Sequence, residues 1–170
     1  DTVRRQRQMC IRDSTARAQR PNPRDLYRLC ASPRPAAQAL ITLRIANWAE
    51  PGDREALKAI RLEVFVREQG VPEAEEMDAF DNESTHILAT TEKNTFVGCA
   101  RLMTTGQIGR MAVQREQRGQ GIGGMLLDAA ITEARRQGRA QIFLHAQCHA
   151  ESFYAQFGFH RIGSTLARPT

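Results

Sequence analysis

The stretch Arg118-Gly119-Gln120-Gly121-Ile122-Gly123-Gly124 separates two segments of different periodicity and decides the fold. Before it lies Gln107–Val113, a short run that is compatible with a strand. After it, apolar residues recur at helical spacing, at Ile122, Met125, Leu126, Ala129, Ala130 and Ala134. The sequence therefore predicts a strand, a glycine turn and an amphipathic helix. Such a turn directs free backbone N–H groups and the positive end of the helix dipole to one point, which favours a bound phosphate there.

The flanking segments predict an α/β (α+β) domain. A half-buried first strand is expected at Ile41–Ala46, where apolar and polar residues alternate. Further elements are expected at Ala56–Phe65 (helix), His86–Thr91 and Phe96–Met103 (hairpin), Ile142–Leu144 (strand), Glu151–Phe157 (helix) and Phe159–Gly163 (strand). We expect a mixed, mostly antiparallel central sheet with helices on both faces, and a parallel strand after the crossover helix.

The positive charge of the chain is concentrated in its first 40 residues. These contain nine Arg and three acidic residues, a net charge of +6, which leaves 15 basic and 16 acidic residues from residue 41 onward. A basic arm can bind nucleic acid, but residues 1–40 show no sustained apolar period, so we expect a disordered tail, non-native in origin, and no nucleic-acid partner. Residues 41–170 are expected to form the folded domain.

No apolar run reaches the length of a membrane span, so we expect no membrane partner. The four cysteines share no metal-type spacing, which predicts free thiols in a reducing compartment, the cytoplasm, and no metal site.

An acidic run with no basic residue extends from Glu73 to Glu83. Such a run is typical of a solvated loop. It could alternatively form an acidic wall that attracts a cationic substrate. Arg101 and Arg110 lie on neighbouring predicted strands, and we expect them to pair with this loop rather than to anchor a substrate carboxylate.

Two spaced motifs together resemble the GNAT superfamily of acetyl-CoA-dependent N-acetyltransferases. Arg118, Gly121 and Gly123 match its core signature, and a second signature follows the fifth strand as Gln147-x-x-Ala150-x-x-Phe153-Tyr154-x-x-x-Gly158-Phe159. The run Val64–Gln69, with Asp78, Asp81 and His86, looks like the ElaA/YjcF-like branch. The resemblance covers residues 41 to 163.

The resemblance implies a site for acetyl-CoA and an amine acceptor, either a small molecule or a peptide. In the family the fourth strand separates from the fifth, and the cofactor arm lies against backbone that corresponds here to Met111, Ala112 and Val113. The pyrophosphate would lie on Arg118, Gly119, Gln120, Gly121, Ile122 and Gly123, with Gln147 as a further contact. Tyr154 would protonate the departing thiolate as the amine attacks the thioester directly. The acceptor would contact Asp78, Asp81 and His86.

Several features depart from the family pattern. The fourth strand offers no glutamate as general base, which leaves Glu68, Asp78, Asp81, His86 and His149 as candidates; of these we favour Glu68 and His149. Gln147 stands where most of the superfamily has Asn. The chain ends at Thr170, where the branch continues into another strand, so we expect a domain that lacks its last strand. The sheet edge left open could pair with a second copy in a homodimer.

Three other functions compete with acetyl transfer. Gly119-x-Gly121-x-x-Gly124 fits a dinucleotide fingerprint, but no Asp or Glu lies between Glu133 and Glu151 to hold a ribose. An NTPase loop requires Gly-Lys-Ser/Thr, which is absent. A catalytically silent acyl-CoA-binding module remains the alternative.

Overall fold

The computed structural model describes residues 5–12, 40–147, 150–162 and 166–167. Its elements, in chain order, are β1 (Arg5–Arg12), β2 (Ile41–Ala46), α1 (Pro51–Arg61), the π-helix η1 (Leu62–Glu68), α2 (Glu73–Glu76), the 3-10 helix η2 (Ala79–Glu83), β3 (Thr85–Thr91), β4 (Phe96–Leu102), β5 (Gln107–Val113), the 3-10 helix η3 (Arg115–Gln117), α3 (Ile122–Arg136), β6 (Gln141–Gln147), α4 (Glu151–Ala155), β7 (His160–Arg161) and β8 (Leu166–Ala167). The predicted elements from residue 41 to residue 161 are thus present.

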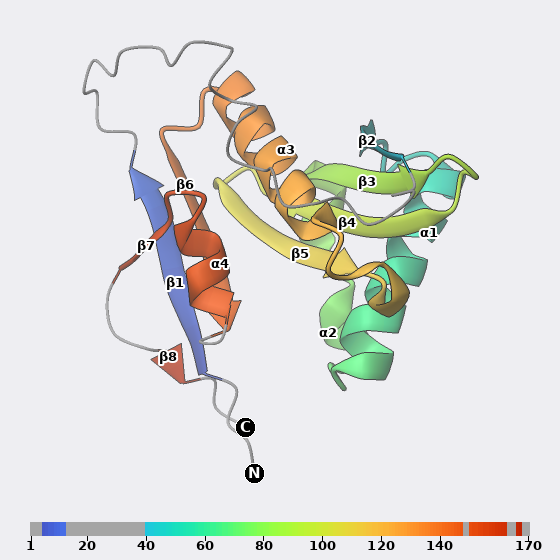
Figure 1. Ribbon diagram of the computed structural model, residues 1–170, viewed down its shortest axis with the longest axis horizontal. Helices are drawn as coiled ribbons and strands as arrows, with labels where there is room; N and C mark the ends of the chain where they lie inside the picture. The colour runs from blue at the N-terminus through green and yellow to red at the C-terminus, as the bar shows by residue number, and fades with distance from the viewer. Residues whose placement is uncertain (1–4, 13–39, 148–149, 163–165, 168–170) are drawn as a thin grey trace.

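The strands form one mixed sheet in the order β2-β3-β4-β5-β6-β1-β7, with β8 paired to β1. Its pairs are antiparallel except for β5 and β6, which are parallel as expected for strands joined by the crossover helix α3. Figure 1 shows β6, β1 and β7 as a group that diverges from β2–β5.

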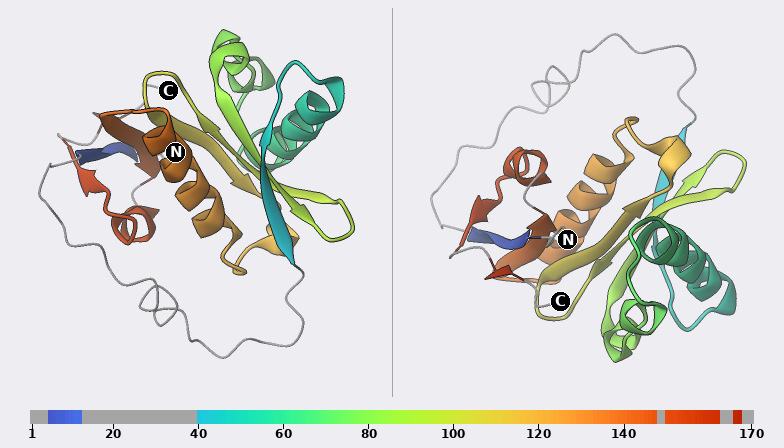
Figure 2. Two further views of the ribbon diagram at one scale, coloured as in Figure 1. Left: turned by 90° about the horizontal axis from the view of Figure 1, so that it is seen from above. Right: turned by 90° about the horizontal axis from the view of Figure 1, so that it is seen from below.

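Helices cover both faces of the sheet (Figure 2). On one face, Leu126, Leu127 and Ala130 of α3 pack into a core that includes Ile87 and Leu144. On the other face, apolar residues of α1 pack against Leu88, Cys99 and Ala112. Residues on β3 therefore alternate between the two cores, which fixes the register of the strand.

Part of the expected tail lies in the sheet. Residues Arg5–Arg12 form β1, which pairs with β6 from Gln6 opposite Gln147 to Arg12 opposite Gln141. These eight residues are described as a strand, whereas 13–39 lie outside the described residues, and the disordered tail stays a prediction. Among the residues the structure describes, no helix is both long and apolar enough to cross a bilayer.

Candidate functional site

A β-bulge interrupts the central strand β5 at Arg110 and Met111. Cys99 of β4 lies opposite Ala112, but Arg101 lies opposite Gly109, so a single residue of β4 faces two residues of β5. Arg110 adopts φ = +48°, which a residue with a side chain rarely adopts. A bulge of this kind bends the strand and turns it away from its partner.

Beyond the bulge, β5 and β6 separate. Their ladder consists of two pairs, Gln107 with Phe143 and Ile108 with Leu144. The two strands diverge after these pairs (Figure 1). The resemblance implied such a separation, and the structure confirms it.

The alternation of a β-strand places two backbone positions of β5 toward the separation. Ala112 is paired with Cys99 of β4, and the Gln114 N–H donates to the Val97 carbonyl at 2.9 Å. Neighbouring residues of a strand present their peptide groups in opposite directions. Met111 and Val113 therefore direct theirs toward the β6 side. The resemblance implied that the cofactor arm contacts the backbone of Met111, Ala112 and Val113, and that contact stays a prediction.

The glycine turn brings a helix N-terminus to the end of β5. Gly119 and Gly121 adopt φ = +79° and +82°, and Gly121 precedes the first residue of α3. The Met125 N–H donates to the Gly121 carbonyl at 3.1 Å, which closes the first turn of the helix. The N–H groups of the preceding helical residues have no intrahelical acceptor, so they can bind an anion. The pyrophosphate-type cradle predicted from the sequence thus has the required local geometry.

Helix α4 packs beside this helix N-terminus. An added Cβ at Gly123 would lie 3.8 Å from Phe153 Cζ, and one at Gly124 would lie 3.2 Å from Phe157 Cζ. Small residues at the start of α3 therefore allow α4 to approach closely. The Tyr154 ring stands edge-on to Phe153 at 5.1 Å and to Phe159 at 6.2 Å. Burial raises the pKa of its phenol above 10, so Tyr154 is protonated at neutral pH.

The acidic run is held by a buried network of arginines. Arg61 of α1 bonds Glu76 Oε1 at 2.7 Å and Asp81 Oδ1 at 2.8 Å, and all three side chains are at most 2% exposed. Arg101 of β4 bonds the same Asp81 oxygen at 2.8 Å, and Asp78 at 2.7 Å. The expected pairing of Arg101 with the loop is confirmed.

The bulge residue Arg110 joins this network. Its Nε lies 3.1 Å from Glu76 Oε1, and its Nη2 lies 3.3 Å from Asp78 Oδ2. Its guanidinium also donates to the backbone carbonyl of Glu75 at 3.0 Å. Arg110 therefore connects the acidic loop to the bulge of β5.

The network is close to neutral in charge, because three arginines face the three carboxylates of Glu76, Asp78 and Asp81. Burial by itself would raise the pKa of Asp81, but the hydrogen bonds and positive charges of Arg61 and Arg101 outweigh it and lower the pKa. The carboxylate stays ionised and paired. These three acids stabilise the loop, and their charge is already compensated within the protein.

The residues predicted to contact the acceptor are enclosed to different degrees. Asp81 and His86 are each 1% exposed, whereas 27% of the Asp78 side chain is exposed. His86 Nε2 lies 2.9 Å from the Asp81 carbonyl oxygen, and its ring stacks on Trp48 with centroids 4.8 Å apart. Burial lowers the His86 pKa, so the ring is neutral at pH 7. Acceptor contact by these residues stays a prediction.

The predicted base Glu68 lies at the end of η1 and contacts the glycine turn. Its Oε2 accepts a hydrogen bond from Arg118 Nη2 at 2.8 Å, and Arg115 Nη2 lies 3.7 Å away. The other candidate, His149, lies outside the described residues, as does the side chain of Gln147. The structure thus brings Glu68 and Arg118 together and leaves the role of His149 a prediction.

Sequence reasoning missed Arg61, which organises the network. A signal was present: Arg61 follows Leu57 by four positions and precedes Val64 by three, so it lies on the apolar face of its helix. A charged residue on that face requires a buried partner. The acidic run was the segment of the chain richest in such partners.

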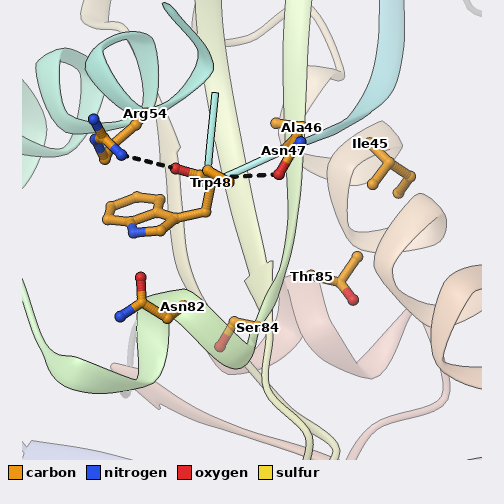
Figure 3. A pocket seen from close by; sticks show the side chains of 9 residues that line it. Ile45, Ala46, Asn47, Trp48, Arg54, Asn82, Ser84 and Thr85 are labelled. Atoms are coloured by element: carbon orange, nitrogen blue, oxygen red, sulfur yellow. Dashed lines mark hydrogen bonds between the residues drawn. The ribbon is translucent and has the colours of Figure 1, made fainter. Parts of the chain in front are cut away.

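A cavity of about 450 Å³ lies at the other end of the sheet. Its lining comes from the ends of β2 and β3, the start of α1 and the end of η2: Ile45, Ala46, Asn47, Trp48, Ala49, Arg54, Asn82, Ser84 and Thr85. In Figure 3 the Trp48 ring lies between Arg54 and Asn82. Thr85 pairs with Leu102 where β4 ends, whereas Val113 and the glycine turn lie where β4 begins. This cavity is therefore separate from the glycine turn.

The sequence comparison agrees with this geometry. Residues 49–168 match the acetyltransferase (GNAT) domain family, so the chain belongs to the GNAT acetyltransferases, a family that uses acyl-CoA. One relative is YjcF of Bacillus subtilis, an uncharacterized N-acetyltransferase, which is 37% identical over 102 residues, 59% of this chain and 73% of that protein.

Solved structures show the same fold. ElaA of Escherichia coli superposes with a TM-score of 0.69 at 25% identity, over 76% of this chain and 94% of that one. A predicted acetyltransferase of Clostridium acetobutylicum, solved with acetyl-CoA, superposes with a TM-score of 0.61 at 22% identity, over 76% of this chain and 96% of that one. The expected fold class is confirmed.

Proposed function

We propose that this protein transfers an acetyl group from acetyl-CoA to an amine of a small molecule or peptide, by direct attack in a ternary complex. One observation carries the proposal: the bulged end of β5, its separation from β6 and the free helix N-terminus of α3 lie in immediate succession along the chain. An extended ligand with a phosphate at one end matches this arrangement. Acetyl-CoA is such a ligand, and the family to which the chain belongs uses acyl-CoA.

The residues present fit acetyl-CoA as a substrate. The turn Arg118–Gly123 would supply backbone donors for the pyrophosphate. Of the backbone predicted to contact the pantetheine arm, Met111 and the Val113 N–H would be available, because Ala112 is paired with β4 and the Val113 carbonyl accepts from Arg118. A backbone N–H of the bulged strand would stabilise negative charge that develops on the thioester oxygen. Gln147 would add a side-chain contact.

Tyr154 would act as the general acid. Its phenol is protonated at neutral pH, and an alkyl thiol has a pKa of about 8.5. Full proton transfer from this phenol to a thiolate is therefore uphill. The phenol would act by donating a hydrogen bond that strengthens as charge develops on the departing sulfur.

The three paired acids of the network would attract cations little, because their charge is compensated within the protein. Because Glu76, Asp78 and Asp81 are paired with arginines, the choice of acceptor would depend on the shape of the site more than on its charge. We infer no preference for a polyamine over a peptide N-terminus from this loop.

Thiol release from acetyl-CoA with a panel of amines tests the function. The panel includes a monoamine, a polyamine, a lysine peptide and a peptide with a free N-terminus. Thiol release that requires one of these amines supports the proposal. Tight CoA binding by calorimetry with no release from any amine supports the silent acyl-CoA-binding module instead.

A further inference from the structure

Glu68 makes a long-range contact that differs from what a general base requires. It ends the π-helix η1, and its side chain is 13% exposed. The Glu68 carboxylate accepts a hydrogen bond of 2.8 Å from Arg118, a residue 50 positions later in the chain. A base that takes a proton from an amine needs a free lone pair directed at the acceptor, and here one oxygen faces two guanidinium groups, those of Arg118 and Arg115.

Arg118 connects Glu68 to the end of strand β5. Its Nε donates to the Val113 carbonyl at 2.9 Å while its Nη2 bonds Glu68. A planar guanidinium held by two acceptors has a fixed orientation. Val113 ends β5, and Arg118 begins the glycine turn. The Glu68–Arg118–Val113 tie therefore joins the π-helix η1, the central strand and the turn.

The turn is a segment that needs such a tie. Both Gly119 and Gly121 have left-handed backbone, and glycine loses more conformational freedom on ordering than any other residue. Glu68 is the last residue of the π-helix η1, and just beyond it the Val71 N–H donates to the Phe65 carbonyl at 2.9 Å. Turns of the π type recur at functional sites.

We propose that Glu68 is a positioning residue of the acetyl-CoA site, acting through Arg118 to hold the turn in the shape that binds the pyrophosphate. The inference rests on the proposed function, because it assigns the turn to acetyl-CoA. It reassigns Glu68 from proton transfer to cofactor binding. The reacting amine therefore loses its proton to another group or to water.

The decisive variant is Glu68→Gln, measured for CoA affinity by calorimetry and for turnover with an accepted amine. We expect the Kd and the KM for acetyl-CoA to rise about three- to tenfold, which is the effect of one charge-assisted hydrogen bond near the surface. Turnover at saturating substrates should stay within about twofold, with an unchanged pH profile. Loss of a general base would instead lower turnover by about a hundredfold or more and remove the acidic limb of the profile.

The negative charge of Glu68 also repels a nearby phosphate. Removing that charge would by itself strengthen CoA binding, which opposes the weakening expected from the lost hydrogen bond. Salt separates the two effects, because added ions screen a through-space repulsion far more than a hydrogen-bonded contact. The measurement is therefore repeated in about 0.5 M NaCl, where the Debye length falls to roughly 4 Å. The weakened binding of Glu68→Gln should persist there.

Glu63→Gln is the matched control. Glu63 lies on the same π-helix and bonds Arg67 at 2.6 Å, but this pair is exposed and its partner is outside the glycine turn. Its Kd for CoA should equal that of the wild type. A cycle with Arg118→Gln adds a second readout: once Glu68 is replaced, replacing Arg118 should weaken binding by much less than it does in the wild type.

Each outcome bears on the inference. Wild-type affinity of Glu68→Gln in about 0.5 M NaCl, or additive effects in the cycle, overturns the tie while leaving acetyl transfer in place. A collapse of turnover with unchanged affinity restores Glu68 as a base. Failure of the wild type to bind CoA overturns both the tie and the proposed function.

Discussion

Replacing Gly121 with leucine tests the assignment of the glycine turn to the pyrophosphate. Gly121 has φ = +82°, and a Cβ added there meets no heavy atom within 4 Å. The cost to the fold is therefore backbone strain alone, about 1–2 kcal/mol for a residue with a side chain in this conformation. For a chain of this size that lowers Tm by roughly 2–8 °C, so the protein stays folded.

The cost to cofactor binding should be much larger. The leucine side chain would stand over the turn and keep phosphate oxygens from the N–H groups at the start of α3. Loss of two charge-assisted hydrogen bonds amounts to about 3 kcal/mol, or roughly a hundredfold in Kd. Isothermal titration with CoA measures the change directly.

Gly138→Leu is the control for this experiment. Gly138 has φ = +69°, follows the other end of the same helix, and its added Cβ also meets nothing within 4 Å. It should show a similar loss in Tm with an unchanged Kd. Equal Kd values for wild type and Gly121→Leu would refute the assignment of the turn to the pyrophosphate.

Three further predictions follow from the site and its supports. Tyr154→Phe should lower turnover about tenfold or more, because the hydrogen bond to the departing sulfur is lost, while the Kd for CoA changes little; wild-type turnover would make Tyr154 a packing residue. Arg61→Met leaves two carboxylates buried without this partner and should cost about 3–5 kcal/mol in denaturant unfolding, against less than about 1 kcal/mol for Arg44→Met, whose pair with Asp53 is partly exposed. Hydrogen bonds from Arg136 and Gln137 lower the Glu133 pKa from 4.5 to about 2. The stability that this carboxylate contributes is therefore present above pH 4.5 and is lost as pH falls toward 2. When unfolding is measured across this pH range, Glu133→Gln should lose less stability than the wild type, and an equal loss would contradict the assignment.

Local patterns predicted the elements around the site because each is determined by its own sequence. Alternation predicted Ile41–Ala46, which is β2 with the same bounds. Glycines at 119 and 121 predicted the turn, since both have the left-handed backbone that glycine favours. Gln107–Val113 was predicted as a strand and is one, but nothing in its sequence indicates the bulge at Arg110.

Contacts between distant residues could not be read in the same way. The acidic run could be solvated or paired, and the choice depends on Arg61, Arg101 and Arg110, which reach it from three different elements. Strand β1 depends on pairing with β6, more than 120 positions later, and its own residues carry no periodic signal. The tie from Glu68 to Arg118 likewise joins residues 50 positions apart, which sequence periodicity does not reveal.

The fate of the acetyl group is the most direct test of the proposed function. Wild-type protein is incubated with acetyl-CoA that carries an isotopic label in the acetyl group, together with an amine, and the products are identified by mass spectrometry. Acetyl transfer predicts the label on the amine nitrogen, in an amount equal to the thiol released. Label that stays on CoA, or that appears only as free acetate, would contradict it.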